Sequence, residues 1–255
     1  MPAAAPSRFR LPTTVRPERY AVSLEPNLRR GTFRGSVAID VRIGRPCETI
    51  VLHAADIDVQ RARIITPGRN VEAPLATSPA DETITLRSPR RLDVGMARLE
   101  LFFSGRLSQH LRGFYAASSG DEAYAFTQCE TADARRIFPC FDEPSFKAHF
   151  NLRVTVDSEH AAISNAPVIA EQRRGRTRVV TFGETPRIST YLFALAVGPL
   201  EGSRVRRCGT TPVQVWHVPG KGGLTAFGLE AAVESLARLE RYFGIPYPYG
   251  KLDLV

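Results

Sequence analysis

The sequence predicts a mainly β protein built as an antiparallel sandwich, followed by a short segment that contains a strand and a helix. Three observations support this class. Apolar and polar residues alternate along many short segments, Gly and Pro turn signals separate these segments, and no regular alternation of strands and helices occurs. The 255 residues, 43% of them hydrophobic, suffice to bury one large β domain, or one domain and part of another.

The period-two alternation is clearest in residues 33–43 and 150–156. In the first of these, Val37, Ile39 and Val41 alternate with mostly polar residues, as expected for a strand with one buried face. Turn signals such as Pro26-Asn27 separate the predicted strands. The remaining strands predicted before residue 200 are Tyr20–Glu25, Thr49–His53, Ala62–Thr66, Thr83–Arg87, Leu99–Phe103, Arg178–Phe182 and Tyr191–Gly198.

The character of the sequence changes near residue 200, which predicts a β domain over 1–200 and a second unit over 201–255. Within the second unit, residues 213–218 form a predicted strand. Residues 251–255 have the pattern of a strand that is only beginning. We therefore expect the second unit to be incomplete.

The one convincing helix covers Thr225 to Tyr242. Its apolar residues recur at intervals of three and four, which places them on one face. Thr225 is expected to cap its start, and Gly244 is expected to end it. The apolar face consists of Leu229, Val233, Leu236, Leu239 and Phe243.

Charge and composition bear on partners and location. The net charge of +8 suggests nucleic-acid binding only remotely, because the basic residues are scattered and no nucleic-acid motif is present. No apolar run approaches the ~18 residues of a membrane helix. The first residues have no apolar core of a secretory signal, so we expect a cytoplasmic protein without a membrane partner.

The four cysteines are Cys47, Cys129, Cys140 and Cys208, and none forms a C-x-x-C pair. Buried free thiols are the favoured interpretation. A disulfide between Cys129 and Cys140 in an oxidising compartment is the alternative.

The most informative stretch runs from Gln128 to Pro144 and reads Q-C-E-T-A-D-A-R-R-I-F-P-C-F-D-E-P. Asp142 and Glu143 could act as an acid–base pair, but a loop held by salt bridges to Arg135 is favoured. On the sequence alone, Glu130 is best interpreted as a structural carboxylate paired with Arg135 or its neighbour Arg136.

This stretch resembles the Q-x-E-x-x-x-A-R-x-x-F-P-C-x-D-E-P signature of the M1 family of zinc aminopeptidases. Flanking segments agree, so the resemblance covers the chain from about Leu11 to Val255. It implies a saddle-shaped N-terminal β domain over 1–200 and the beginning of a thermolysin-like catalytic domain over 201–255. It also implies the N-terminal part of an enzyme that removes N-terminal residues from peptides, with zinc as cofactor of the full-length enzyme.

The resemblance makes Gln128 and Glu130 the candidate substrate-binding residues. It assigns Glu130 to the α-ammonium group of the peptide, which a carboxylate in a partly dry cleft binds by a strong charge-assisted hydrogen bond. It assigns Gln128 to the pocket for the first side chain; a rim residue bonded to backbone is the alternative. In a strand these two residues would share one face, and Cys129 would point toward the core.

No catalytic residue or metal ligand is predicted within the chain. The five histidines are His53, His110, His149, His160 and His217, and no two are four apart, so an H-E-x-x-H motif is absent. We expect the zinc ligands to lie in the missing catalytic domain, which would be the main partner, and the chain alone to be inactive. The competing hypothesis is a non-catalytic binding or scaffold module with the same fold.

Overall fold

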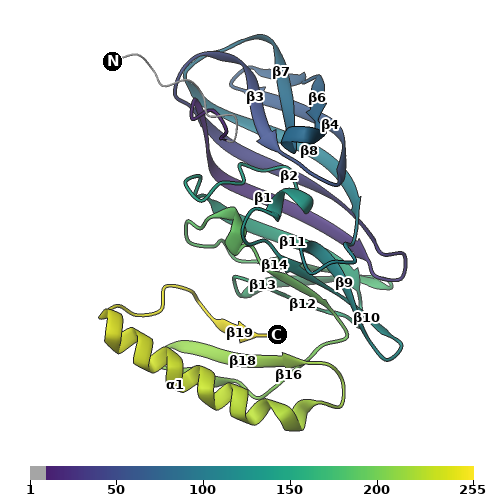
Figure 1. Cartoon of the computed structure of the whole chain (residues 1–255), viewed down its shortest axis with the longest axis vertical. Helices are drawn as coiled ribbons and strands as arrows, with labels where there is room; N and C mark the ends of the chain where they lie inside the picture. The colour runs from purple at the N-terminus through teal and green to yellow at the C-terminus, as the bar shows by residue number, and fades with distance from the viewer. Residues whose placement is uncertain (1–9) are drawn as a thin grey trace.

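The computed structural model describes residues 10–255 and confirms the mainly β fold (Figure 1). Its largest sheet has eight strands in the order β13-β14-β11-β1-β2-β8-β4-β5. Neighbouring strands are antiparallel except β1 and β11, which run parallel. The strands are β1 Val15–Asn27, β2 Thr32–Ile43, β4 Ile57–Thr66, β5 Arg69–Glu72, β8 Gly95–Arg106, β11 His149–Asp157, β13 Val168–Arg174 and β14 Thr177–Phe182.

Two smaller sheets complete the part of the molecule before residue 200. One has the order β3-β7-β6, with β3 Cys47–His53, β6 Leu75–Ser78 and β7 Thr83–Leu92. The other has the order β12-β15-β10-β9, with β9 Gly113–Ser119, β10 Glu122–Gln128, β12 Ala161–Ser164 and β15 Leu195–Gly198. Buried side chains from all three sheets join one hydrophobic core.

The core follows from the alternation in the strands. Val37, Ile39 and Val41 of β2 are at most 1% exposed, and burying each such side chain contributes about 1.5–3 kcal/mol. Within the core, the ring of Tyr20 stacks on that of Phe150 with centroids 4.7 Å apart. The aromatic core therefore fixes β1 against β11.

Residues 201–255 form a sheet and a helix of their own, seen as the lowest part of Figure 1. The helix α1 (Thr225–Phe243) buries Leu229 and Leu236 in a separate cluster with Cys208 and Val213. The central strand of this sheet is β18 (Thr211–His217); its partners are β16 (Glu201–Gly202) and β17 (Arg206–Cys208), both antiparallel, and β19 (Leu252–Leu254), which is parallel. No helix in residues 10–255 is long and apolar enough to cross a membrane.

Two local expectations are wrong. Thr225 does not cap α1, because a 3-10 turn at Gly222–Leu224 leads into the helix and the Thr225 hydroxyl donates back to the carbonyl of Gly222 at 2.8 Å. The strand predicted over Tyr191–Gly198 begins only at Leu195. The side chain of Asn165 accepts the N–H of Ala194 at 2.8 Å, so this backbone is bonded to a side chain before the strand begins.

All four cysteines are free; the expectation of buried free thiols is confirmed for three of them, whereas Cys47 is only half-buried. Cys129 and Cys140 are buried. Burial raises the pKa of both thiols, so they remain protonated at neutral pH.

Candidate functional site

The two candidate substrate residues lie where β10 ends. Gln128 is the last residue of β10 and is paired with Gly113 of β9. The side chains of Gln128 and Glu130 are exposed, whereas Cys129 between them is 3% exposed, with its Sγ 3.3 Å from the carbonyl oxygen of Phe193. The expected inward orientation of Cys129 is therefore confirmed.

Glu130 lies beyond the end of β10, so the shared strand face expected for Gln128 and Glu130 does not form. Pairing with β9 stops at Gln128, because Gly113 is the first residue of that partner strand. The chain then turns, and the backbone N–H of Asp133 donates to the carbonyl of Cys129 at 2.9 Å. The peptide bond between Glu130 and Thr131 is cis. Glu130 thus projects from a turn that follows the sheet.

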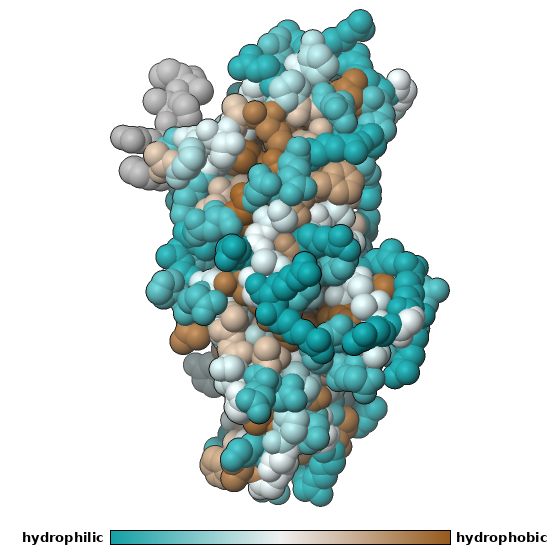
Figure 2. Space-filling model, turned by 90° about the vertical axis from the view of Figure 1, so that its right-hand side faces the viewer, coloured by the Kyte–Doolittle hydropathy of each residue, from teal (hydrophilic) through white to brown (hydrophobic). Residues whose placement is uncertain are grey.

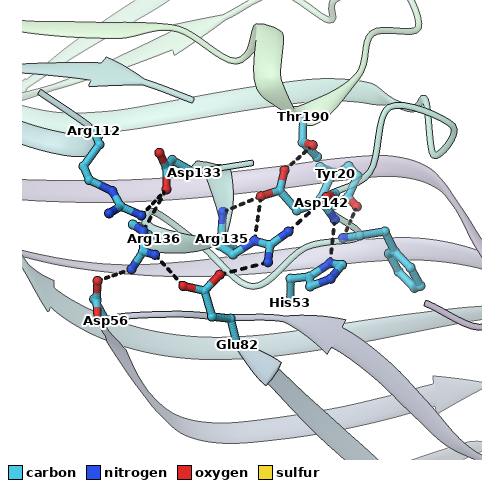
Figure 3. A network of polar contacts seen from close by, with 11 residues as sticks. Tyr20, His53, Asp56, Glu82, Arg112, Asp133, Arg135, Arg136, Asp142 and Thr190 are labelled. Atoms are coloured by element: carbon cyan, nitrogen blue, oxygen red, sulfur yellow. Dashed lines mark hydrogen bonds and ion pairs between the residues drawn. The ribbon is translucent and has the colours of Figure 1, made fainter. Parts of the chain in front are cut away.

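After this turn, a network of arginines and carboxylates fixes the chain (Figure 3). Arg136 pairs with Asp133 at 2.8 Å and also with Asp56. Glu82, which follows the 3-10 turn Pro79–Asp81, accepts from Arg136 and, at 3.0 Å, from Arg135. One carboxylate, from the connection between β6 and β7, therefore links two consecutive arginines of the signature.

The loop that follows is held by a buried ion pair. Asp142, whose side chain is 1% exposed, accepts from the Arg135 Nε at 3.0 Å and from the Thr190 hydroxyl at 2.6 Å. This confirms the predicted salt bridge to Arg135 for Asp142 but not for Glu143. Glu143 plays a different part, because it accepts the backbone N–H of Leu11 at 2.6 Å. The two neighbouring carboxylates thus have separate structural partners.

His53 joins the same loop as a neutral residue. Its Nδ1 accepts the backbone N–H of Asp142 at 3.2 Å. Burial, and then the nearby charge of Arg135, lower the pKa of His53 from 6.5 to about 4. At neutral pH the ring is therefore uncharged and acts as a hydrogen-bond acceptor toward the loop.

Glu130 takes no part in this network. Within residues 10–255, its carboxylate forms neither a hydrogen bond nor an ion pair, because Arg135 and Arg136 are engaged by the other carboxylates. The same described residues offer no hydrogen bond to the side chain of Gln128. Both candidate side chains are thus free to meet a group from outside this fold.

A cleft lies beside β10, between its sheet and residues 247–255. The cleft has a volume of about 410 Å³. Its wall includes Phe126 and Thr127 of β10 on one side and Tyr249, Lys251 and Asp253 on the other. The strand that ends at Gln128 therefore faces residues 247–255 across this cleft.

The described part of the chain does not fit a zinc site. It contains no group of three or more His, Cys, Asp or Glu side chains arranged to hold a metal ion. A catalytic zinc in proteins has three protein ligands of these types.

Sequence reasoning missed Glu82, Asp56, Arg112 and Asp133. Glu82 and Asp56 precede Arg136 by 54 and 80 residues, and no local pattern connects positions so far apart. Asp133 stands within the signature stretch, and its only signal is a carboxylate three residues before an arginine.

The sequence of the chain matches a known protein family and several named proteins. The family described as Peptidase M1 N-terminal domain matches residues 16–192. Aminopeptidase M1-A of Oryza sativa subsp. japonica is 38% identical over 96% of the chain, and Aminopeptidase M1 of Arabidopsis thaliana is 36% identical over 96%. The puromycin-sensitive aminopeptidase of Caenorhabditis elegans is 35% identical over the whole chain.

The alignments cover 29%, 29% and 28% of these three relatives, so the chain spans less than a third of their length. The relatives are aminopeptidases by name, and the family match covers most of the large sheet and both smaller ones. The chain therefore belongs to the M1 peptidase family and carries the N-terminal domain of that family.

Proposed function

We propose that this chain is the N-terminal part of a zinc aminopeptidase and contributes recognition of the substrate's α-ammonium group through Glu130. The observation that carries the proposal is an exposed carboxylate with no partner among residues 10–255, on a turn held by ion pairs on its C-terminal side. Gln128, exposed at the end of β10 just before this turn, would contact the first side chain of the peptide.

The physical basis is charge pairing in a fixed geometry. A charge-assisted hydrogen bond is about twice as strong as a neutral one. Its electrostatic attraction is stronger still where water is excluded. A carboxylate already paired inside its own fold could not offer this to a ligand. Arg135 and Arg136 are paired with other carboxylates, and Glu130 has no partner of its own among residues 10–255. This favours a role for Glu130 in binding the cationic amino group of a substrate.

We further propose that residues 201–255 are the beginning of the catalytic domain and that residues 1–200 are the N-terminal domain. The separate sheet and hydrophobic cluster of residues 201–255 support this division. The exposed apolar side chains on and next to α1 also support it, and Figure 2 shows several brown and tan side chains among hydrophilic ones at this lower end. The exposed side chains are Leu224, Phe227, Leu239, Tyr242, Phe243 and Ile245.

The proposal is tested by replacing Glu130 in the full-length enzyme. Glu130→Gln keeps the shape of the side chain and removes its charge, and Glu130→Ala removes both. We expect kcat/KM for a peptide with a free amino terminus to fall by about ten- to a thousandfold, or about 1.4–4 kcal/mol of lost charge pairing.

Glu122→Gln is the matched control, because Glu122 is an exposed carboxylate at the other end of β10. It should leave the kinetics unchanged. Wild-type kinetics for both Glu130 variants would remove Glu130 from the site.

A further inference from the structure

The turn that carries Glu130 is fixed at both ends. At its start, Cys129 is buried against the carbonyl of Phe193. At its end, the backbone N–H of Asp133 closes the turn on the carbonyl of Cys129 at 2.9 Å. The position of Glu130 therefore depends on where Asp133 is held.

The side chain of Asp133 is tied to two other elements (Figure 3). Its Oδ1 accepts from the Arg112 Nη2 at 2.9 Å and from the Arg136 Nε at 2.8 Å. Burial alone would raise the pKa of Asp133, but the hydrogen bonds from the two arginines outweigh it and lower the pKa. The carboxylate is thus charged at neutral pH and links the turn to the chain on both sides.

Backbone packing also brings the start of β9 against the turn. Arg112 directly precedes Gly113, the first residue of β9. A Cβ atom on Gly113 would lie 2.8 Å from the Cβ of Arg136 and 3.5 Å from the carbonyl oxygen of Asp133. The start of β9, the turn and the following 3-10 turn Ala134–Arg136 are therefore in direct contact.

We infer that Asp133 is a positioning residue for Glu130, acting through its ion pairs with Arg112 and Arg136. The inference rests on the proposed role of Glu130 in binding the substrate amine. Asp133 occupies a position of the signature at which no residue type is fixed, so the resemblance gives it no role. Its replacement should misplace the amine-binding carboxylate without removing it.

The test is a double-mutant cycle in the full-length enzyme, with Asp133→Asn and Glu130→Gln made singly and together. Asp133→Asn should lower kcat/KM by about three- to thirtyfold when Glu130 is present, and by less than about twofold when Glu130→Gln is present. Arg112→Ala should act in the same direction. Arg112→Lys, which keeps a cation for Asp133, should restore part of the loss.

Glu25→Gln serves as the control, because it breaks the exposed ion pair with Arg34 on the large sheet and should leave kcat/KM unchanged. Thermal melting of each variant reports whether it folds. An equal loss with and without Glu130→Gln would show a purely structural effect and overturn the inference, as would unchanged kinetics of Asp133→Asn. If Glu130→Gln alone has wild-type kinetics, the proposed function fails first, and this inference fails with it.

Discussion

At the scale of single residues, His53 makes the stability of the fold depend on pH. Its pKa of about 4 in the folded state lies below the ordinary value of 6.5, because the ring is buried and Arg135 is near. Folding therefore favours the neutral ring. The contribution of the neutral His53 ring to the free energy of unfolding is fully present above pH 6.5 and is lost as the pH falls toward 4. It amounts to about 3 kcal/mol.

We predict that His53→Gln will flatten this dependence. Glutamine can still accept the N–H of Asp142 through its side-chain oxygen, but it does not titrate. Urea unfolding between pH 7 and pH 4.5 measures the free energy of unfolding of both proteins. As the pH falls, this free energy should decrease more steeply for the wild type than for His53→Gln, by up to about 1.4 kcal/mol per pH unit. Parallel curves for the two proteins would mean that His53 is not the group responsible.

At the scale of elements, the β9–β10 hairpin contains two glycines with the same backbone conformation but different surroundings. Gly113 and Gly120 both have positive φ, at 63° and 59°. A Cβ on Gly120 would meet nothing within 4 Å, whereas one on Gly113 would lie 2.8 Å from the Cβ of Arg136. An added side chain would therefore meet the same unfavourable backbone conformation at both positions, but a steric clash only at Gly113.

Gly120→Ala should therefore destabilise the protein by about 1–2 kcal/mol, the usual penalty for a left-handed residue with a side chain. Gly113→Ala should destabilise it further, by an additional ~1–3 kcal/mol for overpacking. Chemical denaturation of the two variants measures the difference. Equal losses would show that the start of β9 can move away from Arg136.

The same elements show what could be predicted from the sequence. Alternation located β2 and β11 because each has one buried face, and helical spacing located α1 to within one residue of its end. It could not locate the end of β10, which depends on where the partner strand stops. It also could not reveal that Glu82 bridges Arg135 and Arg136, since that contact depends on tertiary folding.

At the scale of the whole molecule, a small apolar cluster joins β10 to the sheet of residues 201–255. Tyr124 of β10 is buried there beside Leu200, and Trp216 of β18 packs against them. The indole N–H of Trp216 donates to Asp253 at 3.0 Å. The strand that leads to the candidate site is thus in contact with the unit proposed as the start of the catalytic domain.

The 255-residue chain is expected to lack peptidase activity by itself. A zinc peptidase of the H-E-x-x-H type presents two histidines four residues apart on one helix, with a further carboxylate. The α-helix α1, the only one among residues 10–255, contains no histidine, and no two histidines in the sequence have that spacing. We therefore expect the purified 255-residue chain to show no hydrolysis of a leucine anilide, with or without added zinc.

The full-length enzyme under the same conditions is the positive control, and a chelator distinguishes metal-dependent turnover from background hydrolysis. Turnover by the 255-residue chain that the chelator abolishes would contradict the prediction. It would mean that side chains separated in this fold can come together around a metal. Inactivity of the chain together with activity of the full-length enzyme would place the hydrolytic groups outside these residues and leave recognition of the substrate as the role open to Glu130.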